Sequence, residues 1–402
     1  MMTTTIDAAT SSSVLNETLD RLTQQILATT DTSRADRLWP ADPIVFQTNP
    51  LSLAYGACGT ALFLRERLGS VPPHVMEWIC AQPVDNASYP PGMYSGVAGV
   101  AWTFAELGML DRAWDLFQLI PDSPLAFRCS DIFNGAAGWG LTALHLYFKS
   151  GDSRYLTIAV RAGNYLEDTA EHNEKGACWR DEDGIVRLGF GLGGSGIAVF
   201  QLYLWRVTGE DRYLRLAREA MEFEIAHAQH SCGALVWGSI PDAAEHRPYW
   251  LRGGAGVATA LVRFAQVLEE QHYMDLAHLA AKGCGVFFSV APHLFEGLAS
   301  MGDTLLDMYL ATGQQHYLNG ARQKAQQMLL YAIQTPSGIA FPGRFLLRIS
   351  NDYGMGGAGI GLYLHRLVGL RPRMLHDILP EQLCLTGSMW SKSDRSAALA
   401  TT

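Results

Sequence analysis

Several features that mark other classes of protein are missing from this chain. Only 17% of its 402 residues are charged, and a net charge of -9 without a basic block argues against nucleic acid as the main partner. No run of about 18 uninterrupted apolar residues occurs, so we expect no membrane span. The first residues, MMTTTIDAATSSS, lack a basic region followed by an apolar core and therefore do not predict a secretory signal.

Disulfide and metal patterns are also missing. Cysteine occurs seven times, an odd number, at positions scattered through apolar contexts. Free buried thiols are typical of a reducing cytoplasm, which is where we expect the protein to act. His230 and Cys232 form a lone His-x-Cys pair with no second pair at a suitable distance, so this spacing alone indicates no metal site.

Glycine, in contrast, is abundant and is concentrated in one recurring phrase. Many of the 40 glycines fall in Gly-x-small-Gly, which is followed each time by an apolar run. The phrase occurs seven times, and the sixth copy has Ser300 in place of its second glycine. The first glycines of the copies are Gly56, Gly96, Gly135, Gly193, Gly253, Gly297 and Gly356. Successive copies begin 39 to 60 residues apart, a period that predicts a repeat architecture.

Two kinds of helix are predicted in each repeat. The run after a phrase is apolar on nearly every side, as in WGLTALHLYF (139–148), which suits a helix that is buried all round. The segment ahead of most copies predicts an amphipathic helix instead, as in RYLTIAVRAGNYL (154–166). Gly151, Gly209 and Gly313 are expected to end the buried helices as C′ glycines. The repeating unit is thus a buried helix, a turn and an amphipathic helix.

Seven such units predict either an open solenoid or a closed ring. Because the first helix of each unit is apolar all round, a closed double ring is favoured. We therefore predict an all-α fold, a double-layered α/α toroid with seven inner and seven outer helices, as a single domain over residues 38–385. The longer intervals at 176–190, 232–250 and 336–354 hold strand-like runs and turn residues, and they predict hairpins or loops over one end of the ring.

The two ends of the chain are predicted to lie outside the ring. Residues 1–37 are rich in Ser and Thr, and we expect a flexible N-terminal arm with one helical stretch over 14–28. Residues 386–402 are polar and are expected to form a loose tail.

Six phrases together carry a family resemblance. They are NPLSLAYGACG (49–59), MYSGVAG (93–99), DIFNGAAGWGL (131–141), GFGLGGSG (189–196), PYWLRGGAG (248–256) and FPGRFLLRISNDYGMGGAG (341–359). They resemble the lanthionine synthetase C-like family, and most of all the C-terminal cyclase domain of class III lanthipeptide synthetases. The resemblance covers about residues 38–370 and implies a toroid of seven inner and seven outer helices. The implied activity is cyclisation, in which a cysteine thiol of a modified peptide adds to dehydroalanine or dehydrobutyrine.

The resemblance also identifies the positions of the family's zinc ligands. Zinc-dependent members bind the metal with a cysteine in Trp-Cys-x-Gly and with the pair in Cys-His-Gly. Here Leu251 stands in place of the first cysteine, and Phe295 and Glu296 stand in place of the pair. Leu192 replaces the histidine of a His-Gly-x-x-Gly phrase. This pattern is similar to class III cyclase domains, which lack zinc ligands, so the resemblance implies a zinc-independent cyclase with no cofactor and no metal.

Thiol addition without zinc needs other groups near the glycine phrases. A thiol with a pKa near 8.5 is only a few per cent ionised at pH 7, so a base or a cation must favour the thiolate. The expected catalytic residues are Asp131 or Glu296 as base, Arg252 as partner of thiolate or enolate, and His293, which lies three residues before Glu296. We also expect the inner helices to point their N-terminal ends and free N–H groups toward one mouth of the ring. The alternative is that these side chains form ion pairs across the mouth or cap helices.

Four further residues are expected to bind the peptide substrate. Trp250, Asp352, Tyr353 and Tyr94 lie in or beside the glycine phrases, and each could line a peptide groove. The alternative for Trp250, Tyr353 and Tyr94 is packing within the loops. For Asp352 it is an ion pair or a helix cap.

The partners follow from the resemblance and from one departure from it. Class III synthetases carry lyase and kinase domains ahead of the cyclase domain, whereas no kinase-like phrase precedes residue 38 here. We therefore expect a stand-alone cyclase that acts on a dehydrated precursor peptide made by a separate kinase and lyase. One alternative is a non-catalytic scaffold that binds the precursor and these enzymes. A weaker alternative is a carbohydrate-active α/α toroid, with Asp131 and either Glu296 or Asp352 as its carboxylate pair.

Overall fold

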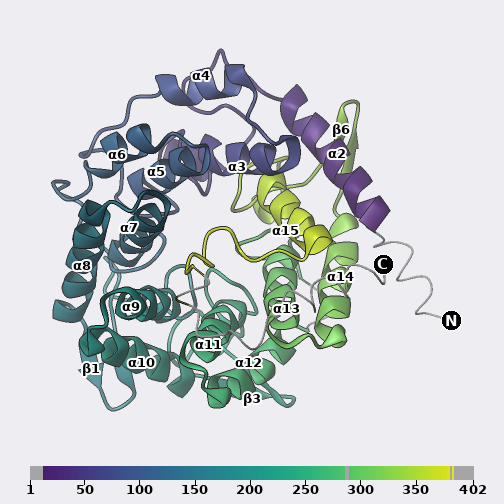
Figure 1. The fold of residues 1–402 in the computed structure, drawn as a ribbon. Helices are drawn as coiled ribbons and strands as arrows, with labels where there is room; N and C mark the ends of the chain where they lie inside the picture. Colours follow the sequence, from purple (N-terminus) through teal and green to yellow (C-terminus); the bar gives the residue numbers. More distant parts are fainter. Residues whose placement is uncertain (1–11, 286–288, 381–382, 384–402) are drawn as a thin grey trace.

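A computed structural model describes residues 12–285, 289–380 and 383, and its helices form two concentric rings (Figure 1). The inner ring consists of α3 (Ala57–Leu68), α5 (Val97–Glu106), α7 (Ala136–Ser150), α9 (Gly194–Thr208), α11 (Gly254–Leu268), α13 (Leu298–Thr312) and α15 (Gly357–Gly369). The outer ring consists of α2 (Ser12–Ala28), α4 (Pro73–Ala81), α6 (Leu110–Phe117), α8 (Ser153–Asp168), α10 (Asp211–Ala226), α12 (Gln271–Gly283) and α14 (Gln315–Leu329). The predicted toroid of seven inner and seven outer helices is therefore confirmed.

The inner helices are buried on all sides, as their apolar sequences predict. In α7, every residue from Ala136 to Leu146 is buried. Neighbouring inner helices pack against one another around the ring, and α15 packs against α3 to close it. Three of the inner-to-outer turns contain the expected left-handed glycines, Gly151, Gly209 and Gly313, with φ of 73°, 72° and 68°. No helix in the described part of the chain is long and apolar enough to cross a bilayer.

In the six phrases that have a second glycine, this residue lies where a loop folds back against the start of an inner helix. A Cβ on Gly138 would lie 2.0 Å from the carbonyl oxygen of Ile132, and one on Gly359 would lie 1.8 Å from that of Tyr353. These approaches leave no room for a side chain, which explains why glycine recurs.

A closed circle of backbone hydrogen bonds joins the seven loops. The residue two places before each first glycine donates its N–H to the carbonyl of the equivalent residue in the next repeat, at 2.8 to 3.2 Å. The seven residues are Ala54, Tyr94, Phe133, Gly191, Leu251, Phe295 and Gly354. The N–H of Gly354 donates to Ala54, so the circle has no open end. We call this end of the ring, where all inner helices begin, the N-terminal mouth, and the opposite end the far end.

Hairpins occur in the three longer intervals, as predicted. The pairs are β1 (Glu171–Asn173) with β2 (Gly176–Cys178), β3 (Gln229–Ser231) with β4 (Ala234–Val236), and β5 (Ile333–Thr335) with β6 (Gly338–Ala340). A short 3₁₀ helix, η1 (Pro43–Phe46), precedes α3, and another, η2 (Arg344–Leu346), follows β6. Each hairpin follows an outer helix, which runs back toward the start of its inner partner. The hairpins therefore lie at the N-terminal mouth end.

The N-terminal helix completes the outer ring. α2 packs against α15 and β6, and it buries Leu15, Leu19, Leu22 and Ile26. The prediction of a flexible arm up to residue 37 differs from the structure here, because the expected helix is the seventh outer helix and covers α15. Residues 1–11, and the tail predicted over 386–402, lie outside the described residues.

The segment after α15 closes the far end. It crosses the middle of the ring in Figure 1, where it is drawn in yellow. Leu375 and His376 are buried, and Nε of Arg206 in α9 donates to the carbonyl of Leu383 at 2.8 Å. The interior of the ring is therefore filled from this end by the chain's own residues 370–380.

Candidate functional site at the N-terminal mouth

One aromatic side chain from each repeat fills the centre of the ring below the N-terminal mouth. These side chains, which we call the aromatic floor, are Tyr55, Tyr94, Phe133, Phe190, Trp250, Phe295 and Tyr353, and all of them are buried. The ring of Tyr94 lies 5.4 Å from that of Phe133 and 5.3 Å from that of Trp250, measured between centroids. Trp250 is also stacked with Phe295 at 5.4 Å. The floor is a close-packed aromatic cluster, in which edge and stacked contacts add to the burial of the rings.

Three of the predicted substrate-binding residues belong to this floor. Trp250, Tyr94 and Tyr353 are 2%, 0% and 8% exposed. The structure thus brings them together, but in contact with one another and not on an open groove. Packing accounts for their positions, and a role in substrate binding remains a prediction.

Arg252 and Glu296 form an ion pair at the mouth. Nη2 of Arg252 lies 2.9 Å from Oε1 of Glu296, and the two side chains are 26% and 23% exposed. Nη1 of Arg247 lies 4.0 Å from the same oxygen. The pair is formed across the contact between two repeats, because Leu251 donates its N–H to the carbonyl of Phe295 in the circle of hydrogen bonds. These charged groups are partly open to solvent, so they can meet a substrate.

Asp131 caps the loop of the third repeat. Its Oδ1 accepts a hydrogen bond from the N–H of Asn134 at 2.6 Å. Burial raises the pKa of Asp131 to about 7, although the backbone N–H groups of Asn134 and Phe133 act in the opposite direction. Asp131 is therefore both a structural cap and a carboxyl group that titrates near neutral pH.

Asp352 occupies the equivalent position, four residues before its glycine. It accepts hydrogen bonds from the N–H of Met355 at 2.7 Å, from the N–H of Asp42 at 2.8 Å and from the hydroxyl of Ser350. Burial raises its pKa to about 6. Since its oxygens are bonded within the loop, the capping alternative accounts for Asp352 without a substrate.

His293 also lies four residues before a first glycine. It is buried, and its Nε2 lies 3.1 Å from the carbonyl oxygen of Pro342. Burial lowers its pKa and so favours the neutral form of the ring. The structure therefore does not bring His293 to the open part of the mouth beside Arg252 and Glu296.

The first turns of most inner helices are bonded to their own loops. The N–H of Ala136 donates to the carbonyl of Cys129 at 2.9 Å, and the N–H of Ala137 donates to that of Ser130 at 3.1 Å. The same bond over seven residues recurs from Ala57, Val97, Gly254, Leu298 and Gly357. The expectation of free N–H groups at the mouth is therefore wrong for these helices. At the N-terminal mouth, an anion would therefore be favoured by the dipoles of these helices and not by free N–H groups.

α9 is the exception, and it is capped by a glutamate side chain that the sequence did not identify. Glu224 of the outer helix α10 accepts hydrogen bonds from the N–H of Ser195 at 3.0 Å and of Gly189 at 3.1 Å. Burial raises its pKa to about 8. A signal was present, because Glu224 follows Ala217, Ala220 and Met221 on the buried face of an amphipathic helix.

The residues at the family's zinc positions do not fit zinc. Leu192, Leu251 and Phe295 have no metal-binding atom, and Glu296 is paired with Arg252. Among residues 12–285 and 289–380, no cluster of three or more His, Cys, Asp or Glu side chains could hold a metal ion.

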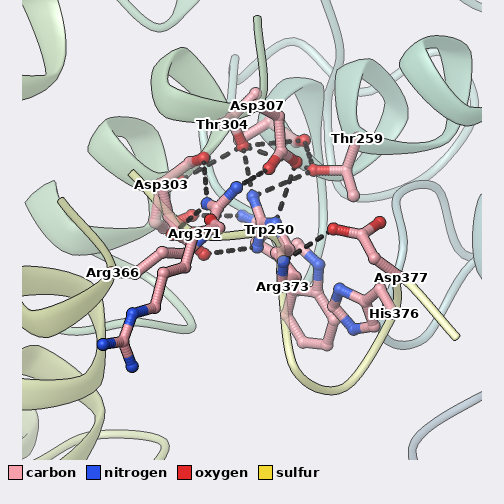
Figure 2. A network of polar contacts seen from close by, with 12 residues as sticks. Trp250, Thr259, Asp303, Thr304, Asp307, Arg366, Arg371, Arg373, His376 and Asp377 are labelled. Carbon is pink, nitrogen blue, oxygen red and sulfur yellow. Dashed lines mark hydrogen bonds and ion pairs between the residues drawn. The ribbon is translucent and has the colours of Figure 1, made fainter. Parts of the chain in front are cut away.

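A second polar site, also not predicted, lies inside the ring toward the far end (Figure 2). Asp303 and Asp307 of α13 are surrounded by three arginines, Arg263 of α11, Arg366 of α15 and Arg373 of the C-terminal segment. All five side chains are buried. The three arginines hold the pKa of Asp307 well below its usual range. This network is a structural ion-pair cluster with few exposed atoms.

A small cavity of about 80 Å³ lies beside this network at the far end. Its lining includes Asp303, Tyr353, Arg366, Arg373 and His376. Part of that lining belongs to the chain's own C-terminal segment, including Arg371, whose side chain is 55% exposed.

The fold and these loops define a lanthionine cyclase-like toroid, and the family comparison agrees. The model of the family described as "Lanthionine synthetase C-like protein" matches residues 108–372, which is more than half of the chain. The protein therefore belongs to the lanthionine synthetase C-like family.

Individual relatives show how far the similarity extends. A Streptomyces coelicolor protein described as "Probable SapB synthase" is 28% identical over 364 residues, which are 90% of this chain and 39% of that protein. The chain thus spans about two-fifths of that relative. The structure of "Nisin cyclase" is 14% identical with a TM-score of 0.61, over 79% of this chain and 88% of that one. An α-1,6-mannanase from Salegentibacter sp., solved with α-1,6-mannotetrose, is 12% identical with a TM-score of 0.54, over 89% and 99%. At these identities the two structures are evidence of the fold alone.

Proposed function

We propose that this protein takes part in lanthipeptide biosynthesis as a zinc-independent cyclase that acts at the N-terminal mouth. Its substrate is a dehydrated precursor peptide, supplied by a separate kinase and lyase in the cytoplasm. The observation that carries the proposal is the partly exposed Arg252–Glu296 ion pair, in which Glu296 stands at one zinc-ligand position of the family and Arg252 directly follows another, Leu251. Membership of the lanthionine synthetase C-like family supports the reaction class.

The proposed reaction moves one proton and forms one C–S bond. Asp131, with a pKa near 7, removes the proton of a substrate cysteine thiol. The thiolate attacks the β-carbon of dehydroalanine or dehydrobutyrine, and the electron pair of the C=C bond moves into the adjacent carbonyl to give an enolate. Arg252 stays protonated and pairs with the thiolate and then with the enolate. The proton then returns to the α-carbon, so no oxidant or further reactant is needed.

Glu296 and the floor have supporting roles in this proposal. Glu296 orients the guanidinium of Arg252 through their 2.9 Å contact. The loop of Asp131 and the loop of Arg252 flank the Gly191 loop in the circle of hydrogen bonds. His293, Trp250, Asp352, Tyr353 and Tyr94 are retained as residues that support the loops around the substrate.

The experiment is cyclisation of a dehydrated precursor, with thioethers counted by mass spectrometry after alkylation of the remaining thiols. We expect the protein to form rings faster than the spontaneous reaction and Arg252→Gln to lower that excess strongly. Arg218→Gln is the matched control, because Arg218 forms a comparably exposed ion pair with Glu270 between outer helices. Ring formation no faster than the spontaneous background would contradict the proposal.

One observation favours a non-catalytic scaffold as the second candidate. Each expected acid or base, Asp131, Glu296 and His293, already has a partner within the protein. The triple variant Asp131→Asn, Arg252→Gln, Glu296→Gln separates the two functions in a reconstituted pathway with kinase and lyase. Full product with the triple variant, but not without the protein, favours the scaffold. Glycoside hydrolysis is not proposed, because Asp131 and Asp352 both cap loops.

A further inference from the structure

The C-terminal segment brings a histidine to the underside of the aromatic floor. The ring of His376 lies 5.4 Å from that of Trp250 at an interplanar angle of 17°, and 4.6 Å from that of Phe190. Its Nε2 lies 3.1 Å from the hydroxyl of Tyr94. His376 thus contacts the rings of Trp250 and Phe190 and the hydroxyl of Tyr94, and Figure 2 shows it beside Trp250.

Arg373 fixes this segment within the ring. Its Nη1 lies 2.7 Å from Asp303, its Nε lies 2.8 Å from Asp307, and its backbone N–H donates to Asp377 at 2.6 Å. Asp377 in turn pairs with Arg263 of α11 at 2.7 Å. A segment held by buried ion pairs on two inner helices cannot shift without leaving buried charges unpaired. His376 is therefore held in one place relative to those helices.

Trp250 connects His376 to the mouth. Its backbone N–H is bonded to Ser300, and the next residue, Leu251, belongs to the circle of hydrogen bonds. Arg252 follows directly and carries the guanidinium at the mouth. A shift of the Trp250 indole therefore moves the backbone of Trp250, which lies only two residues before Arg252.

We propose that His376 is a positioning residue for the cyclisation site, which it supports from the far side of the floor through Trp250 and Tyr94. This inference rests on the proposed function, since it assigns His376 to the support of Arg252. Burial, together with Arg373 and Arg263, lowers the pKa of His376 well below its usual value, so the ring acts as a neutral one. Its contribution is a stacked contact and one hydrogen bond.

The test compares three variants in the full chain. His376→Ala removes the stacking and the hydrogen bond, whereas His376→Phe retains an aromatic ring of similar size and removes only the bond. His365→Ala is the control, because His365 lies at the same end of the ring in α15 but contacts Arg67 and Arg371 and not the floor. The protein is labelled with 5-fluorotryptophan, and the Trp250 resonance is assigned with Trp250→Phe.

We expect His376→Ala to lower kcat for cyclisation roughly tenfold with little change in KM, and to shift the Trp250 fluorine resonance. His376→Phe restores most of the rate, and His365→Ala changes neither quantity. A wild-type rate and an unshifted resonance in His376→Ala overturn the inference. If His376→Ala does not fold, His376→Phe, which removes the hydrogen bond to Tyr94, is used for the fluorine measurement: a shifted Trp250 resonance supports the inference, and an unshifted resonance overturns it.

Failure of the proposed function is recognised separately. If the wild-type protein forms rings no faster than the spontaneous reaction, the proposed function fails. The inference about His376 is then tested by the fluorine resonance alone. A shift of the Trp250 resonance in His376→Ala but not in His365→Ala still supports the positioning of Trp250 by His376. An unshifted resonance overturns it.

Discussion

Ser300 shows how a single side chain adapts a repeated phrase. Six of the seven copies have glycine at this position, where the loop lies close to the helix start. In the sixth copy, Ser300 is buried and its hydroxyl accepts the N–H of Trp250 at 2.6 Å. The hydroxyl therefore satisfies a backbone group of the neighbouring repeat.

We expect Ser300→Ala and Ser300→Gly both to lower the free energy of unfolding by about 1–3 kcal/mol, because either change leaves the buried N–H of Trp250 without its partner. Denaturant unfolding followed by circular dichroism measures the change. Ser153→Ala, at an exposed position in α8, is the control and should be close to neutral. A Ser300→Gly variant as stable as the wild type would show that the hydroxyl contributes nothing and that glycine alone suits the position.

Asp131 predicts a distinctive pH dependence. Its pKa is raised from 3.8 to about 7 by burial, so the folded state holds the proton more tightly than the unfolded state. The stability that this group contributes is therefore fully present below about pH 4 and is lost as pH rises to about 7. As the proposed base, Asp131 must be ionised, so activity should rise over the upper part of the same range.

We expect kcat/KM for cyclisation, after subtraction of the spontaneous rate, to rise with an inflection near pH 7. In Asp131→Asn this inflection should disappear, leaving only the rise that comes from ionisation of the substrate thiol near pH 8.5. The rates are measured between pH 5.5 and 9, with Asp352→Asn as a variant at the equivalent loop position. An unchanged inflection in Asp131→Asn would assign it to another group.

At the scale of elements, α2 shows what amphipathic periodicity can and cannot predict. The apolar spacing over residues 14–28 indicates a helix, and a helix is present over Ser12–Ala28. The same pattern does not say which surface the apolar face covers. That surface is formed by α15 and β6, which lie more than 300 residues further along the chain. It therefore cannot be predicted from local periodicity.

We expect Leu19→Ala to lower the free energy of unfolding by about 2–5 kcal/mol, because Leu19 is fully buried in the contact of α2 with the ring. Gln24→Ala, at an exposed position on the same helix, is the matched control. Both are measured by denaturant unfolding. A near-neutral effect of Leu19→Ala would mean that α2 is a detachable arm, as the composition of the N-terminus alone indicates.

Local sequence likewise predicts one part of the candidate site, whereas another part depends on contacts between segments far apart in the chain. The phrases locate Arg252 and Glu296, and the circle of hydrogen bonds places them together. The ion-pair network was not predicted, because Asp303 and Asp307 find their partners on α11, on α15 and in the C-terminal segment. One sign was readable in the sequence, namely two acids four residues apart within an otherwise apolar helix. Their cations could not be assigned without the fold.

At the scale of the whole molecule, the C-terminal segment belongs to the core of the toroid. We expect Arg373→Ala to lower the free energy of unfolding by about 3–5 kcal/mol, because the buried carboxylates of Asp303 and Asp307 each lose one ion-pair partner. Arg371→Ala is the control two residues away, since the Arg371 side chain is 55% exposed and pairs with Glu66 at the surface. Equal stability of the two variants, measured by denaturant unfolding, would contradict a structural role for the segment.

The closed circle of seven backbone hydrogen bonds affects how this protein can unfold and whether its number of repeats can vary. An open array of repeats can unravel from either end, and it can gain or lose a unit while its remaining neighbours stay in contact. Here every repeat has two neighbours, and the last repeat is completed by α2, near the start of the chain. We infer that loss of any one unit disrupts the whole circle, so thermal unfolding should occur in a single step without fraying. We therefore expect relatives to vary in the side chains that the circle surrounds and in the loops above it, and to keep the number of units.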